Sequence, residues 1–472
     1  MKTKTKLLAF LLVACMTLPV LLVGCGKDTG VDKRPPRPDG KTELIYYIWG
    51  NDEEIAMAQD IIDAFEEENA DIIVTIERAG TDYYGTLQQR FGAKNAPDVF
   101  FMETGEIMPF VTQGLIEPLD AYMANSQNIT EDDLWDVNEA YRKDGKLYAF
   151  IKDWSPMFML LYNKKHIDQY NADHNFRKGD EGYLEYPDED VPMTWDEYYE
   201  FASKLTVKQS DGTIRYGSTM DYVPYKHLMQ MIQANGSTFY TEDFMNFNKD
   251  DPKVKEAFEY FIRLQYDEDS SVTPPAKYLP GGSIASGGEK FKNGQVSTVF
   301  YGSWAFKSFG YKDAPLLDVG IAPAPIPSSR IIDGERQNYV TMAGAVSHAI
   351  SARSPYKEAA YKFIEFYLTE GSKVLANNSF NIPGSKTVSE NEYVNVEDEY
   401  YRNINNIFMK AADYTHGIIA NPYIRETEVE GIVSAEISKV MSGEAELDSA
   451  LKSIYNKIHD RIEAFVSIWG KN

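Results

Sequence analysis

Apolar residues follow two different spacings at the start of the folded part of the chain. The run 43–49 is apolar and rich in β-branched and aromatic residues, and Gly50 ends it. Apolar residues then recur at helical spacing from Ile55 onward, directly after the capping sequence 51–54. A second apolar run at 71–76 predicts another strand. The body of the chain is therefore expected to open with a strand, a helix and a strand.

The same alternation continues with a helical pattern at 83–91 and a short apolar run at 97–102. Strands that alternate with helices predict a mainly parallel sheet with helices on both faces. Such a sheet binds ligands just beyond the carboxyl ends of its strands. Trp49 and Glu103 both follow predicted strands, so we expect them at a binding site.

Two further strands are predicted at 145–150 and 158–163. A crossing between two lobes could fall in the sequence between them. Asp153 and Trp154 lie in that connecting sequence, and a crossing would bring both residues to the space between the lobes.

Later segments predict surface structure and one well-defined helix start. Residues 171–191 are acidic and have no apolar period, which indicates a surface insertion. The sequence from Thr194 fits a capping box at the start of a helix. The glycine-rich sequence 280–288 has neither dinucleotide-binding nor phosphate-loop spacing and predicts a flexible connection.

The first 24 residues have the pattern of a secretion signal. Three lysines precede the apolar run 7–23, and a small residue stands before Cys25. The sequence 22–25 resembles the bacterial lipobox, in which the cysteine receives a diacylglycerol and becomes the mature N-terminus. We therefore expect residues 1–24 to be a lipoprotein signal peptide and the polar, proline-rich stretch 25–40 to be a tether. An uncleaved transmembrane anchor is the alternative, and both place the body outside the membrane.

Charge and composition exclude several classes of function. The net charge is −25, which argues against nucleic acid or anionic membrane surfaces as partners. Both cysteines lie within the first 25 residues, so the mature body has no disulfide and no cysteine-based metal or nucleophilic site. The six histidines form no close pair. We expect no metal and no cofactor, although scattered acids leave a structural metal open.

Several sequence blocks resemble the family 1 extracellular solute-binding proteins, the sugar-binding lipoproteins related to maltodextrin-binding proteins. The most specific block is 291–304, which is similar to the pattern F-x-x-G-x-x-A-M-x-x-x-G-x-W but has Ser297 and Thr298 in place of Ala-Met. Other blocks of the family stand in the expected order along the chain, before and after this one, at 96–99, 114–119, 145–149, 161–164, 194–197, 343–346, 354–364 and 382–384.

The resemblance implies a periplasmic-binding-protein-like α/β fold with two lobes, each a mainly parallel sheet flanked by helices. We expect residues 41–152 and 320–375 in the first lobe, and 153–319 and 376–472 in the second. Hinge closure would bury the solute between them. The implied partners are the permease subunits of an ABC importer and the lipid bilayer, through the acyl chains of Cys25. We expect the protein to be a monomer.

A sugar cleft needs aromatic platforms for apolar ring faces and polar groups for hydroxyls. Trp49, Trp154 and Trp304 suit the first role, and Glu103 and Asp153 suit the second. Core packing is the alternative for the three tryptophans, a solvated or capping acid for Glu103 and Asp153, and an exposed salt bridge for Arg425. The full set of expected ligand-binding residues is Trp49, Glu103, Asp153, Trp154, Tyr222, Asn235, Trp304, Gly344 and Arg425.

Three other functions compete with sugar capture. A secreted glycoside hydrolase would also place carboxylates in an aromatic cleft. A lipoprotein that binds another polar solute and a scaffold or adhesion lipoprotein are the others. The resemblance and the tether favour binding without turnover, so we expect no enzymatic activity. The identity and length of the sugar stay open at this level.

Overall fold

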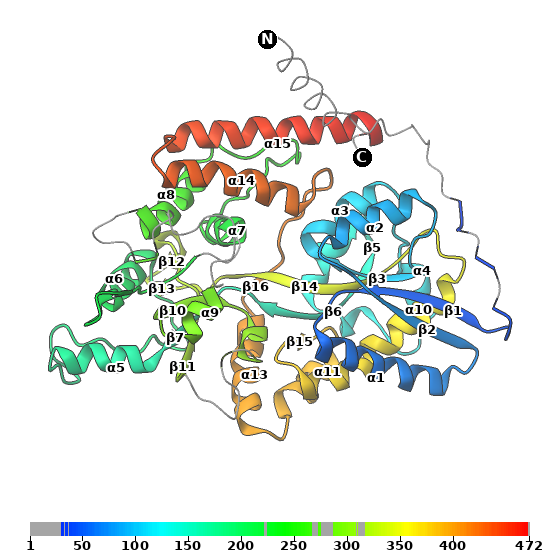
Figure 1. Cartoon of the computed structure of the whole chain (residues 1–472), viewed down its shortest axis with the longest axis horizontal. Coiled ribbons are helices and arrows are strands. Elements are labelled where there is room, and N and C mark those ends of the chain that lie inside the picture. The colour runs from blue at the N-terminus through cyan, green and yellow to red at the C-terminus, as the bar shows by residue number, and fades with distance from the viewer. Residues whose placement is uncertain are drawn as a thin grey trace, which may run out of the picture.

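The computed structural model describes residues 30–32, 34–35, 37–220, 224–266, 272–274, 287–307, 309 and 317–470. Figure 1 shows two bodies side by side, with β6 and β14 running from one toward the other. We call the body around the larger sheet the first lobe and the body around the smaller sheet the second lobe. The two-lobed α/β architecture confirms the expected fold class.

A seven-stranded sheet forms the centre of the first lobe, in the order β15-β6-β14-β3-β1-β2, with β16 paired to β14. Its strands are β1 (Thr42–Ile48), β2 (Ile72–Arg78), β3 (Val99–Glu103), β6 (Ala149–Pro156), β14 (Val340–Ile350), β15 (Ile382–Pro383) and β16 (Thr415–His416). Strand β1 runs parallel to β2 and β3, whereas β14 runs antiparallel to β3 and β6.

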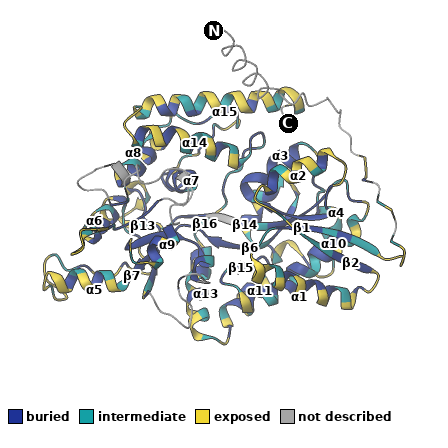
Figure 2. Cartoon of the chain, viewed as in Figure 1, coloured by how far each residue is buried: buried dark blue, intermediate teal, exposed yellow. Residues whose placement is uncertain are grey.

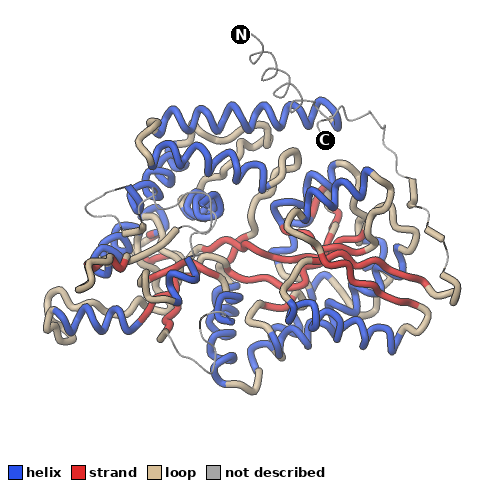
Figure 3. Tube along the Cα trace, in the orientation of Figure 1, coloured by secondary structure: helices blue, strands red, loops and turns tan. Residues whose placement is uncertain are grey.

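Helices cover both faces of this sheet, as Figure 3 shows. They include α1 (Asp52–Glu68), α2 (Tyr83–Gly92), α3 (Thr104–Thr112), α4 (Asp120–Met123), α10 (Lys357–Phe366), α11 (Ser372–Asn378), α12 (Lys386–Asn391) and α13 (Glu399–Ala412). In Figure 2 the strands are largely buried, while α1 presents an exposed outer face. The first-lobe core therefore lies between the sheet and its helices.

The second lobe contains a three-stranded sheet in the order β10-β7-β11. Its strands are β7 (Met159–Asn163), β10 (Thr298–Tyr301) and β11 (Val319–Ala322). Its helices are α5 (Lys164–Asp173), α6 (Trp195–Leu205), α7 (Pro224–Ala234), α8 (Pro252–Tyr266), α9 (Gly287–Lys292), α14 (Glu426–Met441) and α15 (Leu447–Trp469). One cluster of buried apolar residues from these helices and strands forms most of its core, and the other faces of β7, β10 and β11 pack into the cluster around the larger sheet.

The predicted helix starts are confirmed in detail. The side chain of Asn51 accepts from the backbone N–H of Glu54, and Glu54 accepts in return from the backbone N–H of Asn51. Thr194 and Glu197 form the same reciprocal pair at the start of α6. These local signals are reliable because both partners lie within one helical turn.

The strand directions and lobe boundaries differ from those expected at four places. Strand β7 runs antiparallel to both of its neighbours, so the second sheet is not parallel. Strand β11 pairs with β7, which puts residues near 320 in the second lobe. Strand β6 continues to Pro156 within the first sheet, and β15 joins that sheet beyond residue 376. A sequence pattern shows where a strand lies, but the neighbours it pairs with depend on distant segments.

Several expected features fall partly or wholly outside the described residues. The signal peptide and Cys25 lie there, as do residues 26–29, 33 and 36 of the tether and residues 280–286 of the expected flexible connection. Residues 287 and 288 instead begin helix α9. Among the residues that the structure describes, none of the helices combines the length and the apolarity needed to cross a membrane.

Candidate functional site

Trp49 follows the carboxyl end of β1, as the sequence predicted, and its indole is partly buried in an aromatic cluster. Its ring meets Tyr83 edge-on at a centroid distance of 4.5 Å and Phe101 at 5.1 Å. Tyr84 lies at 6.2 Å on the same cluster. These neighbours hold the indole in place and leave part of its surface open.

Glu103 ends β3 and stands directly before α3. Its Oε2 accepts a hydrogen bond from the Tyr84 hydroxyl at 3.1 Å, and the backbone N–H of Glu103 donates to that hydroxyl at 3.1 Å. Burial raises the pKa of Tyr84 well above its usual range, so the phenol stays a neutral donor. Tyr84 therefore contacts both Trp49 and Glu103, and the structure brings these two predicted residues together.

Lys152 and Asp153 form a buried ion pair in β6. Consecutive residues of a regular strand point to opposite faces, but a register shift between β6 and β14 at this position allows the contact. Burial opposes the charged form of Lys152, yet the Asp153 carboxylate raises the pKa of Lys152 above its ordinary value. Lys152 Nζ also lies 5.6 Å from the centre of the Phe101 ring, beside Trp49. The Asp153 carboxylate is thus already paired, and it accepts from Asn381 as well at 3.3 Å.

Lys226 of α7 reaches from the second lobe toward the first. Its Nζ lies 4.0 Å from Glu103 Oε1 and 3.8 Å from Glu426 Oε2. One ammonium group therefore stands between a first-lobe and a second-lobe carboxylate. Neither Lys226 nor Glu426 was expected from the sequence, because neither belongs to a motif that places it beside Glu103.

The first turns of α3 and α14 touch across the two lobes. Glu106 Oε1 accepts from the backbone N–H of Thr427 at 2.8 Å. A Cβ on Gly105 would lie 2.0 Å from Glu426 Oε2, so the glycine is what allows this approach. Burial raises the pKa of Glu106 to about 7. The sequence analysis missed this contact as well.

Trp304 follows β10 and packs against the cores of both lobes. A Cβ on Gly302 would lie 2.0 Å from a carbon of its six-membered ring. The glycine and tryptophan of the G-x-W motif are therefore coupled by packing, which places the indole at the junction of the lobes.

Other predicted residues have different surroundings. Trp154 is 1% exposed and packs edge-on against Trp135 at 5.4 Å, which leaves almost no indole surface for a solute. Asn235 is buried at the end of α7 and bonds to Lys253, Glu256 and Ser329. The interpretation of Trp154 and Asn235 as solute contacts is therefore not supported by their positions.

The three remaining candidates are less defined. Arg425 precedes α14 beside the inter-lobe contact, and its Nε donates to Glu428 at 3.2 Å. Gly344 lies in β14. Tyr222 lies outside the described residues.

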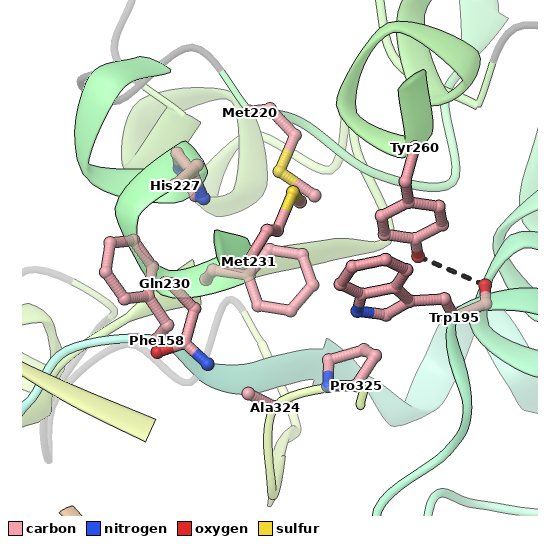
Figure 4. A pocket seen from close by; sticks show the side chains of 10 residues that line it. Phe158, Trp195, Met220, His227, Gln230, Met231, Tyr260, Ala324 and Pro325 are labelled. Atoms are coloured by element: carbon pink, nitrogen blue, oxygen red, sulfur yellow. Dashed lines mark hydrogen bonds between the residues drawn. The ribbon is translucent and has the colours of Figure 1, made fainter. Parts of the chain in front are cut away.

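A separate pocket lies inside the second lobe, as Figure 4 shows. It is lined by aromatic and methionine side chains, among them Phe158, Met220 and Met231. On one side the rings of Trp195 and Tyr260 stack at 4.5 Å, and the Tyr260 hydroxyl donates to the Trp195 carbonyl at 3.1 Å. This pocket belongs to the core of one lobe and is distinct from the contact between the lobes.

The part of the chain that the structure describes offers no candidate metal site. No group of three or more His, Cys, Asp or Glu residues there could hold a metal ion.

Two α/β lobes with an aromatic and polar cluster at their junction define a two-lobed binding protein. A family model described as bacterial extracellular solute-binding protein matches residues 60–398, and the chain belongs to this family. This confirms the resemblance noted in the sequence and gives the folded body an extracytoplasmic location.

Two curated relatives have low sequence identity to this chain but align with it over most of its length. The chain is 24% identical over 328 residues to the maltotriose-binding protein of Pyrococcus abyssi. This alignment covers 68% of this chain and 62% of that protein. It is 22% identical over 400 residues to the galactooligosaccharide-binding protein of Bacillus subtilis, covering 82% of this chain and 83% of that protein.

Solved structures share the fold over nearly the whole chain. An ABC substrate-binding protein of Listeria monocytogenes in complex with cycloalternan superposes with a TM-score of 0.72 at 22% identity, covering 90% of this chain and 99% of that one. The sugar-binding protein MalE of Xanthomonas citri gives a TM-score of 0.71 at 17% identity, covering 90% and 98%. At these identities the likeness establishes the fold.

Proposed function

We propose that this protein captures a sugar or oligosaccharide in the cleft between its lobes and delivers it to an ABC importer. The observation that supports the proposal is that Glu103, which shares Tyr84 with Trp49 on the first lobe, lies 4.0 Å from Lys226 of the second lobe. The names of the relatives, which bind maltotriose and galactooligosaccharides, support the same solute class.

The chemistry of these groups suits a polyhydroxylated ring. A partly buried indole offers a flat apolar surface, while a carboxylate and an ammonium group accept from and donate to hydroxyls. Tyr84 fixes the Glu103 carboxylate through its neutral hydroxyl. Because the two charged groups come from different lobes, a solute bound to both favours the closed form.

The experiment is a thermal-unfolding screen of the mature protein against mono- and oligosaccharides and other small polar solutes. A ligand that binds only the native state raises the midpoint of unfolding. We expect a rise with at least one sugar and none with amino acids or peptides. A rise confined to non-sugar solutes would contradict the sugar assignment. Cleavage products from labelled oligosaccharides would instead indicate a glycoside hydrolase.

Membrane attachment through Cys25 is part of the proposal. A diacylglycerol carries two acyl chains, which suffices for stable anchoring without a transmembrane helix. We expect Cys25→Ala to release the protein from the membrane fraction. Retention of that variant after signal cleavage would rule out the lipid anchor.

A further inference from the structure

The first turn of α14 takes a hydrogen-bond acceptor from the opposite lobe. A helix leaves its first N–H groups without intrahelical partners, and a side chain at the N-cap usually accepts from one of them. Within the described part of the chain, Arg425 at the N-cap of α14 makes no such bond through its side chain. Glu106 of α3 accepts instead from the backbone N–H of Thr427 at 2.8 Å. One lobe therefore caps a helix of the other.

This cap is buried within a group of acids. Glu106 is 1% exposed and Glu426 is 7% exposed. Glu106 Oε2 and Glu426 Oε1 have no hydrogen-bond partner among the described residues. Burial of an ionised carboxyl without full pairing is costly, so a neutral form of the cluster is favoured.

Charged and titratable groups from several elements lie around Glu106 and Glu426, including Tyr141, whose hydroxyl bonds to Thr104 at the start of α3. The acids are Glu103 of β3 and Glu426 and Glu430 of α14, and the cations are Lys226 of α7 and Arg425. Tyr84 and Tyr240 add phenols whose pKa values are raised by burial. Glu426 and Arg425 are the charged groups that act on Glu106 directly, and Glu103, Glu430 and Lys226 extend the cluster around Glu426. With all four acids ionised, the cluster has excess negative charge over its two cations.

We propose that Glu106 is a latch between the lobes, which holds the cleft closed by capping α14, and that closure takes up a proton at this carboxyl cluster. The inference rests on the proposed function, since it concerns the cleft assigned to the solute. A protonated carboxyl keeps a carbonyl oxygen that accepts from Thr427, so the hydrogen bond persists after protonation while the repulsion from Glu426 is removed.

The direction of the pH effect follows from linkage. In an open form Glu106 would meet water, and its pKa would return toward the ordinary value for a glutamate. In the closed form burial raises the pKa of Glu106 to about 7, and burial also raises the pKa values of Glu426 and Glu430. The closed form binds protons more tightly, so the closed fraction is expected to grow as the pH falls through about 7.

The test measures the distance between the lobes without any solute. The mature body has no native thiol beyond Cys25. In a Cys25→Ala background, two introduced cysteines are therefore the only sites that thiol-reactive dyes can label. We place them at Glu67→Cys on α1 and Lys165→Cys on α5. Single-molecule energy transfer is recorded between pH 5.5 and 8 for four versions: wild type, Glu106→Gln, Glu106→Ala and Asp82→Asn. Asp82 caps α2 within the first lobe, so its variant is the matched control. Circular dichroism confirms that each variant is folded.

We expect wild type and the Asp82→Asn control to open as the pH rises. Glu106→Gln, which keeps an acceptor without a titrating proton, should stay closed and lose most of this response. Glu106→Ala should be open across the whole range. The proposal is overturned if Glu106→Gln responds to pH as wild type does, or if Glu106→Ala is as closed as wild type. Because no sugar is present, failure here leaves the proposed function untouched.

Discussion

Trp49 and Trp154 were expected to share one role, yet their surroundings differ. Trp49 stands just after a strand and keeps part of its ring exposed, with Tyr83 and Phe101 fixing its orientation. Trp154 lies inside β6, which runs on to Pro156. A side chain within a central strand points into a packed layer, so the Trp154 ring became part of the core.

Replacing each tryptophan by alanine should separate the two roles. For Trp49→Ala we expect affinity for the solute to fall about tenfold to hundredfold, which corresponds to roughly 1–3 kcal/mol. For Trp154→Ala we expect the free energy of unfolding to fall by about 3–5 kcal/mol with affinity largely kept. Calorimetry and denaturant unfolding on the same variants measure both quantities. Unchanged affinity in Trp49→Ala would remove this residue from the site.

Gly302 should tolerate no side chain, because a Cβ there would lie 2.0 Å from the Trp304 ring. Gly302→Ala is expected to displace the indole and to lower the free energy of unfolding by about 1–3 kcal/mol through overpacking. Gly431→Ala on α14 is the control, since nothing lies within 4 Å of a Cβ at that position. That variant should match or exceed wild-type stability, given the better helix propensity of alanine. Equal stability of the Gly302 and Gly431 variants in urea unfolding would refute the packing argument.

At the scale of the element, β6 combines a bulge with a buried ion pair. Removing one partner of such a pair leaves an uncompensated charge, so Asp153→Asn should lower the free energy of unfolding by about 3–5 kcal/mol. The exposed pair Lys373–Glu370 provides the comparison. Glu370→Gln there should cost no more than about 1 kcal/mol. Denaturant unfolding of both variants measures these free energies. A small decrease in the free energy of unfolding of Asp153→Asn would mean that water reaches Lys152.

The cap of α14 also predicts how stability depends on pH. Burial raises the pKa of Glu106 to about 7, above its value in the unfolded chain, so the native state holds a proton that the unfolded state releases. This contribution to stability is present in full below the unfolded-state pKa and is lost as the pH rises through about 7. Between pH 5 and 8 the free energy of unfolding of wild type should therefore fall relative to Glu106→Gln. Parallel pH profiles of the two proteins would contradict the raised pKa.

Elements were easier to predict from the sequence than the contacts between them. The capping boxes at Asn51 and Thr194 and the first strands depend on neighbours a few residues away, and they were confirmed. Lys226 and Glu106 could not be found in this way, since their partners Glu103 and Thr427 lie over a hundred and over three hundred residues away along the chain. Trp154 was misplaced because the sequence did not show how far β6 extends.

Across the whole molecule, the two lobes are built around different sheets, although buried residues of β7, β10 and β11 also pack into the cluster around the larger sheet. β6 and β14 belong to the first sheet and lead toward the second lobe, and the chain crosses once more between α13 and α14 (Figure 1). Few chain connections between the two sheets permit a hinge motion without unfolding either lobe. The contacts of Glu103 with Lys226 and of Glu106 with Thr427 then determine how firmly the lobes close.

The proposed function places a sugar between Trp49, Glu103 and Lys226. The most direct measurement is a calorimetric titration of the mature protein with the sugar that most raises its unfolding midpoint, repeated on Glu103→Gln. We expect saturable binding of one sugar per chain. Binding to the variant should be at least about tenfold weaker, because a charged hydrogen bond contributes roughly 1.5–3 kcal/mol. The absence of saturable heat with any mono- or oligosaccharide, or equal affinity in Glu103→Gln, would contradict this proposal.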